Sequence, residues 1–228
     1  IKTISGCEFK NYDIGCAFCN VPYSEKAFSL DEIKEALIRL KNSGVEFRHF
    51  LIGGGTCLRS DIWETIISIA KYLKSGGGFP EKPISLMSIL PPSGTDKNSV
   101  MSKLKEAGIE EVAFNLEVCD ENLAKCLMPG KYKSKQIFYD TMKDAVKIFG
   151  INHVRSAIVV GLDKTENIVG EVCNMAKNGI MPCLSALRAL PGAKANLTLH
   201  PSNDYLLEVY IQCKNALINT DYPIKVLG

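Results

Sequence analysis

Short apolar runs alternate with longer amphipathic stretches along this chain. Each apolar run is four to eight residues long and ends in loop residues. Runs of this length and composition are typical of strands that are buried on both faces of a sheet. The pattern predicts strands over residues 50–53, 84–89, 111–116, 154–161 and 180–187.

The amphipathic stretches carry recognisable helix start and stop signals. In FSLDEIKEALIRLKNSG, Ser29 can cap a helix, Glu32 completes a capping box, and Gly44 ends the helix. Phe28 and Ile33 are placed to form the hydrophobic staple of the same helix start. Further helices are predicted over residues 61–74, 99–107, 134–149, 166–177 and 203–217.

Regular alternation of strands and helices predicts parallel strands joined by right-handed crossovers. A first strand at residues 2–5 brings the prediction to six strand–helix units, and YPIKVLG at residues 222–228 is a candidate seventh strand. A closed eight-stranded barrel usually takes about 250 residues. Six units in a chain of 228 residues are too few for a closed barrel. We therefore expect an α/β fold in the form of a partial (βα)6 TIM-type barrel, with a doubly wound sheet as the alternative.

Composition narrows the class of protein. With 228 residues and 46% hydrophobic side chains, the chain is expected to form a single domain over residues 1–228. The formal net charge of +2 is spread without a basic stripe, so no nucleic acid is expected as a partner. No apolar run reaches the roughly 18 residues that span a membrane, so we expect a cytoplasmic protein without a membrane partner.

Nine cysteines are many for an intracellular chain, and an odd number cannot all pair. Three of them, Cys7, Cys16 and Cys19, fall within thirteen positions with the spacing CX8CX2C. A zinc site usually has four ligands in two pairs, whereas three thiolates suit a [4Fe–4S] cluster with one open iron. A structural zinc or another iron–sulfur site remains the alternative at this point.

The cysteine loop follows the first predicted strand, which places it at the C-terminal mouth of a barrel, where active sites lie. With Phe18 as the aromatic residue of CAFC, the loop resembles the CxxxCxΦC loop of radical S-adenosylmethionine (SAM) enzymes. That resemblance implies a [4Fe–4S] cluster on Cys7, Cys16 and Cys19 whose open iron chelates SAM. The spacing between Cys7 and Cys16 departs from the common three residues, and a longer loop could reach over the substrate.

Later segments resemble the same family in the same order. FLIGGGTC resembles the glycine segment that binds the SAM amino group, with Thr56 where the family often has Glu and with glycines Gly53, Gly54 and Gly55. Asn115 and Glu117, two apart at a strand end, are expected on one face, where they could bind the ribose hydroxyls. Val160 and Gly161 correspond to the family's segment beside adenine.

Further residues are weaker candidates. Arg155 and Arg188 interrupt apolar strand-like runs and could each neutralise a carboxylate of SAM or substrate, and Ser88 is a low-grade candidate for the same site. Either arginine could instead reach Glu117 or solvent. A second cluster is possible but unlikely on composition alone, because its candidate ligands form no compact motif: Cys57, Cys119 and Cys183.

The resemblance implies reductive cleavage of SAM to a 5′-deoxyadenosyl radical that abstracts hydrogen from the substrate. NLEV and the PG segments resemble the biotin-synthase-like branch, with its cofactor maturases and lipoyl synthases, and favour cofactor biosynthesis by sulfur insertion or carbon-skeleton chemistry. The expected partners are a small-molecule or carrier-bound substrate and an electron donor such as ferredoxin or flavodoxin. The alternatives are a radical SAM methylase, a peptide-modifying enzyme, and a non-catalytic iron–sulfur carrier or scaffold.

Overall fold

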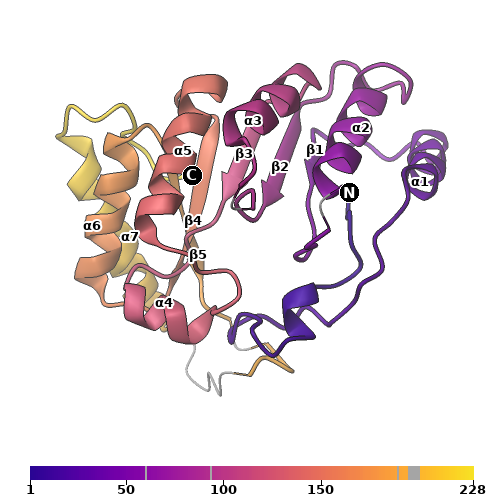
Figure 1. Cartoon of the computed structure of the whole chain (residues 1–228). Helices are drawn as coiled ribbons and strands as arrows, with labels where there is room; N and C mark the ends of the chain where they lie inside the picture. The colour runs from indigo at the N-terminus through magenta and orange to yellow at the C-terminus, as the bar shows by residue number, and fades with distance from the viewer. Residues whose placement is uncertain (60, 93, 189, 195–200) are drawn as a thin grey trace.

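The computed structural model describes residues 1–59, 61–92, 94–188, 190–194 and 201–228. Its centre is one parallel sheet of five strands in the order β1-β2-β3-β4-β5 (Figure 1). A doubly wound sheet would reverse its winding at one point and change the strand order there. The observed order never reverses, so the fold is a partial barrel that is open along one side.

Each strand lies close to its predicted position. Phe50 of the first strand pairs with Ile84 of the second, and Val112 of the third pairs with Val154 of the fourth. All neighbouring pairs are parallel. The strands are β1 (Phe50–Ile52), β2 (Ile84–Ser88), β3 (Glu111–Phe114), β4 (Val154–Val160) and β5 (Met181–Ala186).

The predicted helices are present, and two short ones are added. The capping box of the first helix is confirmed: Ser29 Oγ accepts from the Glu32 N–H, and the Glu32 carboxylate accepts from the Ser29 N–H. The helices are η1 (Glu8–Lys10), α1 (Leu30–Asn42), α2 (Ile62–Lys74), α3 (Lys97–Glu106), α4 (Glu121–Leu127), α5 (Lys135–Phe149), α6 (Thr165–Lys177) and α7 (Asn203–Ile218). Helices η1 and α4 are too short to show a hydrophobic period in sequence.

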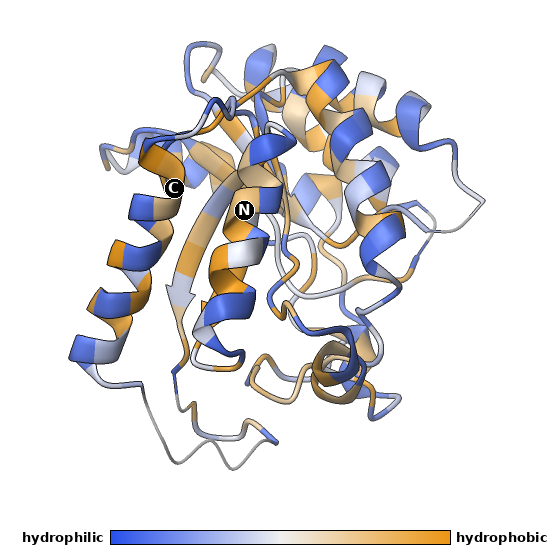
Figure 2. Ribbon diagram, turned by 90° about the vertical axis from the view of Figure 1, so that its left-hand side faces the viewer, coloured by the Kyte–Doolittle hydropathy of each residue, from blue (hydrophilic) through white to orange (hydrophobic). Residues whose placement is uncertain are grey.

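Helices cover the outer face of the sheet, and the inner face stays open. Figure 2 shows that several helices carry hydrophobic residues on one side and hydrophilic residues on the other. In β4 the even-numbered residues are buried, whereas Arg155, Ala157 and Val159 alternate with them and face the open side. On β1 and β2, Leu51 and Met87 are exposed large apolar residues. The sheet thus has a buried outer face and an accessible inner one.

Two predicted strands are not formed as such. Residues 2–5 contribute an isolated parallel bridge, Lys2 to Gly53, in place of a strand, with the Thr3 N–H donating to Gly53 O at 2.9 Å. Residues 222–228 form no assigned strand, although the Gly228 N–H donates to Pro182 O at 2.9 Å. Each segment therefore lies beside an edge strand with too few ladder bonds to continue the sheet.

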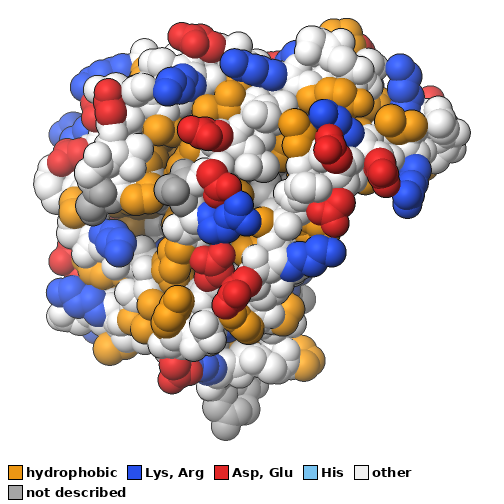
Figure 3. Space-filling model, turned by 45° about the vertical axis from the view of Figure 1, so that its right-hand side comes forward, with side chains coloured by type: hydrophobic (Ala, Val, Ile, Leu, Met, Phe, Trp, Pro, Cys, Tyr) orange, Lys and Arg blue, Asp and Glu red, His pale blue; other side chains and the backbone are white. Residues whose placement is uncertain are grey.

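On the face shown in Figure 3, acidic and basic side chains are interspersed among hydrophobic patches. No helix among the described residues combines the length and the apolar character that a membrane crossing requires.

Candidate active site

One cavity of about 340 Å³ lies between the C-terminal ends of the strands and the cysteine loop. In Figure 1, η1 and α4 lie below these strand ends, beside the N-terminal loop. The sequence placed the cysteine loop at this mouth, and the structure agrees. The predicted residues that line the cavity are Cys7, Cys16, Phe18, Cys19, Gly54, Gly55, Thr56, Ser88, Asn115, Glu117 and Arg188.

Backbone hydrogen bonds fix the three cysteines of the loop. The Cys7 N–H donates to Pro22 O at 2.9 Å, which ties the two ends of the loop together. The Cys19 N–H donates to Cys16 O at 3.2 Å and closes a tight turn between these two cysteines. The Val21 N–H lies 3.4 Å from the Cys19 Sγ and donates to it. All three thiols are free and partly exposed to the cavity.

The number of cysteines at the cavity equals the number of thiolates that hold a [4Fe–4S] cluster with one open iron. In the part of the chain that the structure describes, no three His, Cys, Asp or Glu side chains are placed to hold a single ion. A cubane binds each cysteine on a different iron, so its ligands surround the cluster instead of converging on one point. The three thiols line one cavity, and their role as cluster ligands stays a prediction.

Burial and, to a smaller extent, the neighbouring Glu117 carboxylate raise the pKa of Cys16 to about 12, while Lys131 opposes the shift. The unligated thiol is therefore protonated at neutral pH. Iron binds thiolates, so iron binding at Cys16 would have to release that proton.

The glycine segment after β1 allows close contact between two backbones. A Cβ on Gly55 would overlap the carbonyl oxygen of Gly6, the residue before Cys7. At Gly54, φ is 149° and a Cβ would lie 3.2 Å from Ile4 O. Glycine is required at both positions because the chain that leads to the cysteine loop passes directly over them. Gly53 faces an adjoining pocket of about 160 Å³ instead of the main cavity.

Asn115 and Glu117 line the cavity, but not through regular strand alternation. Strand β3 ends at Phe114, and Glu117 has a left-handed backbone with φ of 66°. Asn115 Oδ1 accepts from the Ala157 N–H at 3.2 Å, and the Glu117 N–H donates to Ala157 O at 2.8 Å. A non-glycine residue in this conformation costs of order 1–3 kcal/mol, and such residues cluster at functional sites.

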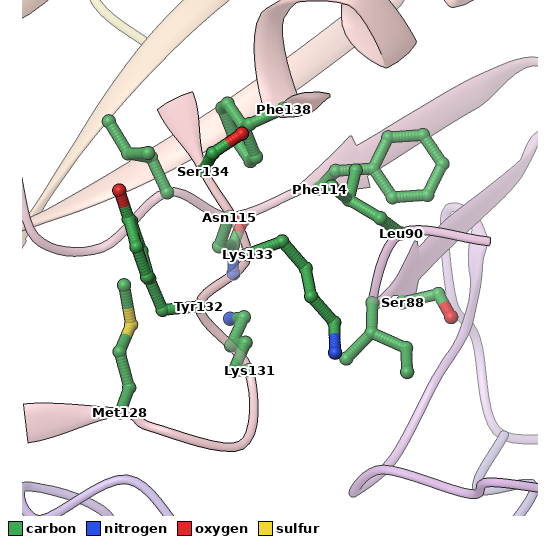
Figure 4. Close-up of a pocket in the computed structure, with 12 residues that line it drawn as sticks. Ser88, Leu90, Phe114, Asn115, Met128, Lys131, Tyr132, Lys133, Ser134 and Phe138 are labelled. Carbon is green, nitrogen blue, oxygen red and sulfur yellow. The ribbon is translucent and has the colours of Figure 1, made fainter. Parts of the chain in front are cut away.

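Lys131 is a cavity residue that the sequence analysis missed. Its Nζ lies 2.9 Å from Glu117 Oε2, and the two side chains are 18% and 17% exposed. This approach lacks hydrogen-bond geometry, so the solvent-shielded Oε2 keeps its capacity to accept a bond. Lys131 also lines a small pocket beside the cavity, shared with Ser88 and Asn115 (Figure 4). It follows α4 in a loop without periodicity, which offers no sequence signal.

Val160 and Gly161 do not line the cavity, whereas their neighbour Val159 does. Val160 is buried, and its carbonyl accepts from the Leu187 N–H at 2.9 Å. Gly161 has φ of 114°, and a Cβ there would lie 3.1 Å from Leu187 Cβ. The two residues hold the ends of β4 and β5 together, and their contact with adenine remains a prediction.

Arg155 is not brought together with the cavity residues, which corrects its place in the expected site. It lies near the start of β4, four positions before Val159, and therefore roughly 13 Å along the strand from the cavity. Its guanidinium pairs with Glu111 at 2.8 Å, and the Ser85 hydroxyl donates to the same carboxylate at 3.2 Å. This polar group lies on the open inner face, in a separate pocket.

The segment between Cys7 and Cys16 does not cover the cavity, contrary to expectation. None of the cavity-lining residues comes from residues 8–15. Residues 11–13 are exposed, and η1 packs instead against the loop after β1. The extra length therefore lies beside the cysteine loop and not above the substrate position.

The three candidate ligands of a second cluster lie outside the main cavity. Cys57 is buried in the adjoining pocket behind the glycine segment. Cys119 is buried in the loop after β3, and Cys183 is half-buried on β5 opposite Ala157. The three lie after β1, after β3 and on β5, and a second cluster on them stays a prediction.

Asp163 is a second residue that sequence reasoning missed. It is 7% exposed, and its carboxylate accepts from the Cys119 N–H and the Asp120 N–H, each at 2.8 Å. These bonds tie the end of β4 to the loop that follows Glu117. A buried carboxylate with two backbone donors is well compensated, and here it fixes the backbone on which Glu117 sits.

Comparison with known families identifies the superfamily to which the chain belongs. The family model described as the Radical SAM superfamily matches residues 1–176. The chain belongs to the radical SAM superfamily. Membership confirms the expected superfamily, and implies an enzyme that uses a [4Fe–4S] cluster and SAM.

Relatives share the fold over part of their length. Bacteriochlorophyllide c C-7(1)-hydroxylase of Chlorobaculum limnaeum is 28% identical over 124 residues, covering 53% of this chain and 30% of the relative. Methylornithine synthase (PylB) has a TM-score of 0.67 at 19% identity, over 93% of this chain and 61% of that one. HydG, a maturase of the [FeFe]-hydrogenase, has a TM-score of 0.71 at 15% identity, over 96% and 49%. The chain thus spans about a third to three fifths of these proteins.

Proposed function

We propose that this chain binds a [4Fe–4S] cluster through Cys7, Cys16 and Cys19 and cleaves SAM reductively to start radical chemistry on a substrate. The observation that carries this proposal is the shared cavity: the three cysteines face Asn115 and Glu117 across it. A cluster held by these cysteines would supply the electron needed to split SAM into methionine and a 5′-deoxyadenosyl radical. The protein's part is to position the cofactors and to exclude water.

The residues that line the cavity can each contact a different part of SAM or the substrate. The backbone of Gly54 and Gly55 can approach the methionine amino group closely because no side chain intervenes. Glu117 Oε2 and Asn115 can bind the ribose hydroxyls. Thr56 offers a hydroxyl where many relatives have a carboxylate, so its bond to the amino group is weaker than a charged one. Exposed Arg188, at the rim, can hold an anionic group of the substrate.

For the reaction, we favour cofactor biosynthesis by sulfur insertion or carbon-skeleton rearrangement, as in the biotin-synthase-like branch. NLEV and the PG segments support this branch, and the structural neighbours include a methylornithine synthase and a hydrogenase maturase. The substrate is a small molecule or a group on a carrier protein, and a ferredoxin or flavodoxin donates the electron.

A second candidate is radical modification of a larger substrate. The curated relative is named as a bacteriochlorophyllide hydroxylase, and the radical SAM methyltransferase TsrM of Kitasatospora setae is similar in fold, with a TM-score of 0.60. A methylase or peptide-modifying enzyme belongs to the same class. A non-catalytic iron–sulfur carrier is the remaining alternative. Such a carrier does not bind SAM and would not need residues that bind its ribose.

The test is anaerobic reconstitution with iron and sulfide, followed by incubation with SAM and dithionite. Chromatography with mass detection should show 5′-deoxyadenosine and methionine, and Cys16→Ala should give neither. Iron-loaded wild-type protein that leaves SAM intact would favour the carrier, and stoichiometric zinc without iron would exclude the radical chemistry. Isotope transfer from candidate substrates to 5′-deoxyadenosine then separates the two reaction classes.

A further inference from the structure

The eight residues between Cys7 and Cys16 are anchored on two sides of the cysteine loop. The Glu8 N–H donates to Thr56 O at 2.9 Å, and the Glu8 carboxylate accepts from the Leu58 N–H at 2.8 Å. On the other side, the Gly130 N–H donates to Ile14 O at 2.9 Å. The segment is therefore held between the loop after β1 and the loop after α4.

Lys10, inside this segment, reaches the backbone of two cysteine ligands. Its Nζ donates to Cys16 O at 3.2 Å and to Cys19 O at 2.6 Å. The aliphatic part of the side chain crosses Gly15, where a Cβ would lie 2.6 Å from Lys10 Cδ. Gly15 thus leaves the space through which the ammonium passes to the CAFC turn.

The charge of Lys10 is directed at this turn, and no carboxylate among the described residues pairs with it. Nearby Lys131 pairs with Glu117, and Lys194 pairs with Asp13 of the same segment. Among the described residues, Lys10 donates only to the two carbonyl oxygens. Its side chain is half-buried, so this positive charge is screened less than a fully exposed one.

We infer that the long spacing between Cys7 and Cys16 builds a brace for the cluster, in which Lys10 is the positioning residue. The ammonium holds the carbonyls of Cys16 and Cys19 in place, so the two thiolates are arranged before iron arrives. It also places a positive charge beside a group that gains negative charge on reduction. Net charge and hydrogen bonding around a cluster set its reduction potential, so Lys10 favours the reduced state. This inference rests on the proposed cluster.

Three substitutions separate the geometry of the brace from its charge. Lys10→Met removes both, Lys10→Gln keeps a donor without the charge, and Lys10→Arg keeps both. Lys194→Met is the matched control, because Lys194 bonds the same segment at Asp13 but not the cysteines. Thermal melting of the unloaded proteins shows whether each variant folds.

The readouts are iron per chain after anaerobic reconstitution and the midpoint potential from a redox titration followed by electron paramagnetic resonance. We expect Lys10→Met to take up less iron and to titrate at a more negative potential. Lys10→Gln should keep the iron content but share the potential shift, while Lys10→Arg and Lys194→Met should match wild type. Lys10→Met with unchanged iron content and potential would overturn the inference. Wild type that takes up no iron would instead overturn the proposed function.

Discussion

Lys131 Nζ lies 2.9 Å from Glu117 Oε2 in the wall of the cysteine cavity. Both side chains are less than one-fifth exposed, so neither charge is fully hydrated. Removing one partner of a buried ion pair leaves an uncompensated charge, which costs about 3–5 kcal/mol in fully buried cases. The pair therefore holds the Glu117 side chain in place, and among the described residues its Oε2 has no other hydrogen-bond partner and can accept a bond from a ligand.

From this geometry we expect Glu117→Gln to weaken SAM binding to the reconstituted protein roughly tenfold or more. The loss of a charge-assisted hydrogen bond costs about 1.5–3 kcal/mol, which corresponds to that factor. Anaerobic isothermal titration calorimetry measures the affinity. Glu106→Gln, on exposed surface at the end of α3, is the control and should bind normally.

Combining Glu117→Gln with Lys131→Met tests whether the two residues act as a unit. If Lys131 acts by orienting Glu117, the double variant should bind about as weakly as the worse single variant, because contacting residues are not additive. Fully additive losses would mean that Lys131 contacts the ligand independently. Unchanged affinity in Glu117→Gln would place the ribose elsewhere in the cavity.

Cys16→Ala should abolish the brown colour and the visible absorbance of the reconstituted protein. Cys16 is one of three thiols at the cavity, and two remaining cysteines cannot replace a three-point attachment. Iron analysis and absorbance spectroscopy follow the loss. Cys126→Ala is the comparison, because this exposed cysteine lies on α4 and does not line the cavity. Equal iron content in both variants would contradict the assignment.

Gly55→Ala should lower both the melting temperature and the iron uptake. A methyl group there would overlap the Gly6 carbonyl, so one of the two backbones has to move, and Gly6 leads directly into Cys7. Gly170→Ala is the matched control, since a Cβ on this helical glycine meets nothing within 4 Å. Alanine favours a helix over glycine by about 1 kcal/mol, so the control should melt no lower than wild type.

Asp163→Asn should lower the free energy of unfolding by about 1.5–3 kcal/mol, because the carboxylate accepts two bonds from backbone N–H groups while largely buried. Urea denaturation followed by circular dichroism measures the change. For comparison, Asp144→Asn removes a surface ion pair with Lys147 and should cost less than about 1 kcal/mol. A similar decrease in the free energy of unfolding in both variants would contradict the anchoring role of Asp163.

The sequence alone predicted the repeating part of the fold and the core of the site. Strands and long helices recur with a hydrophobic period, and cysteine and glycine segments carry recognisable spacing. Lys131 and Asp163 escaped because their importance depends on contacts across the fold: Lys131 reaches Glu117, and Asp163 reaches Cys119 and Asp120. A local sequence pattern does not show which residues contact each other across the fold.

Arg155 shows the opposite error. A cation inside an apolar run indicates a position that needs a partner, but not the end of the strand at which it lies. The partner is Glu111 on the neighbouring strand, far from the cysteines. The segment with residues 11–13 was also misplaced, because its length alone predicted that it would cover the cavity. Hydrogen bonds of Glu8 and Lys10 hold this segment beside the cysteine loop instead.

The close approach of Gly55 to Gly6 indicates that the cysteine loop depends on the surrounding fold for its conformation. The loop takes its form from a backbone about fifty residues later and, through Ala17 and Leu127, from one more than a hundred residues later. A synthetic peptide of residues 5–20 would carry the three thiols without the surfaces that set their directions. Transplanting the cysteine loop into another scaffold would require the end of β1 and the end of α4 to be moved with it.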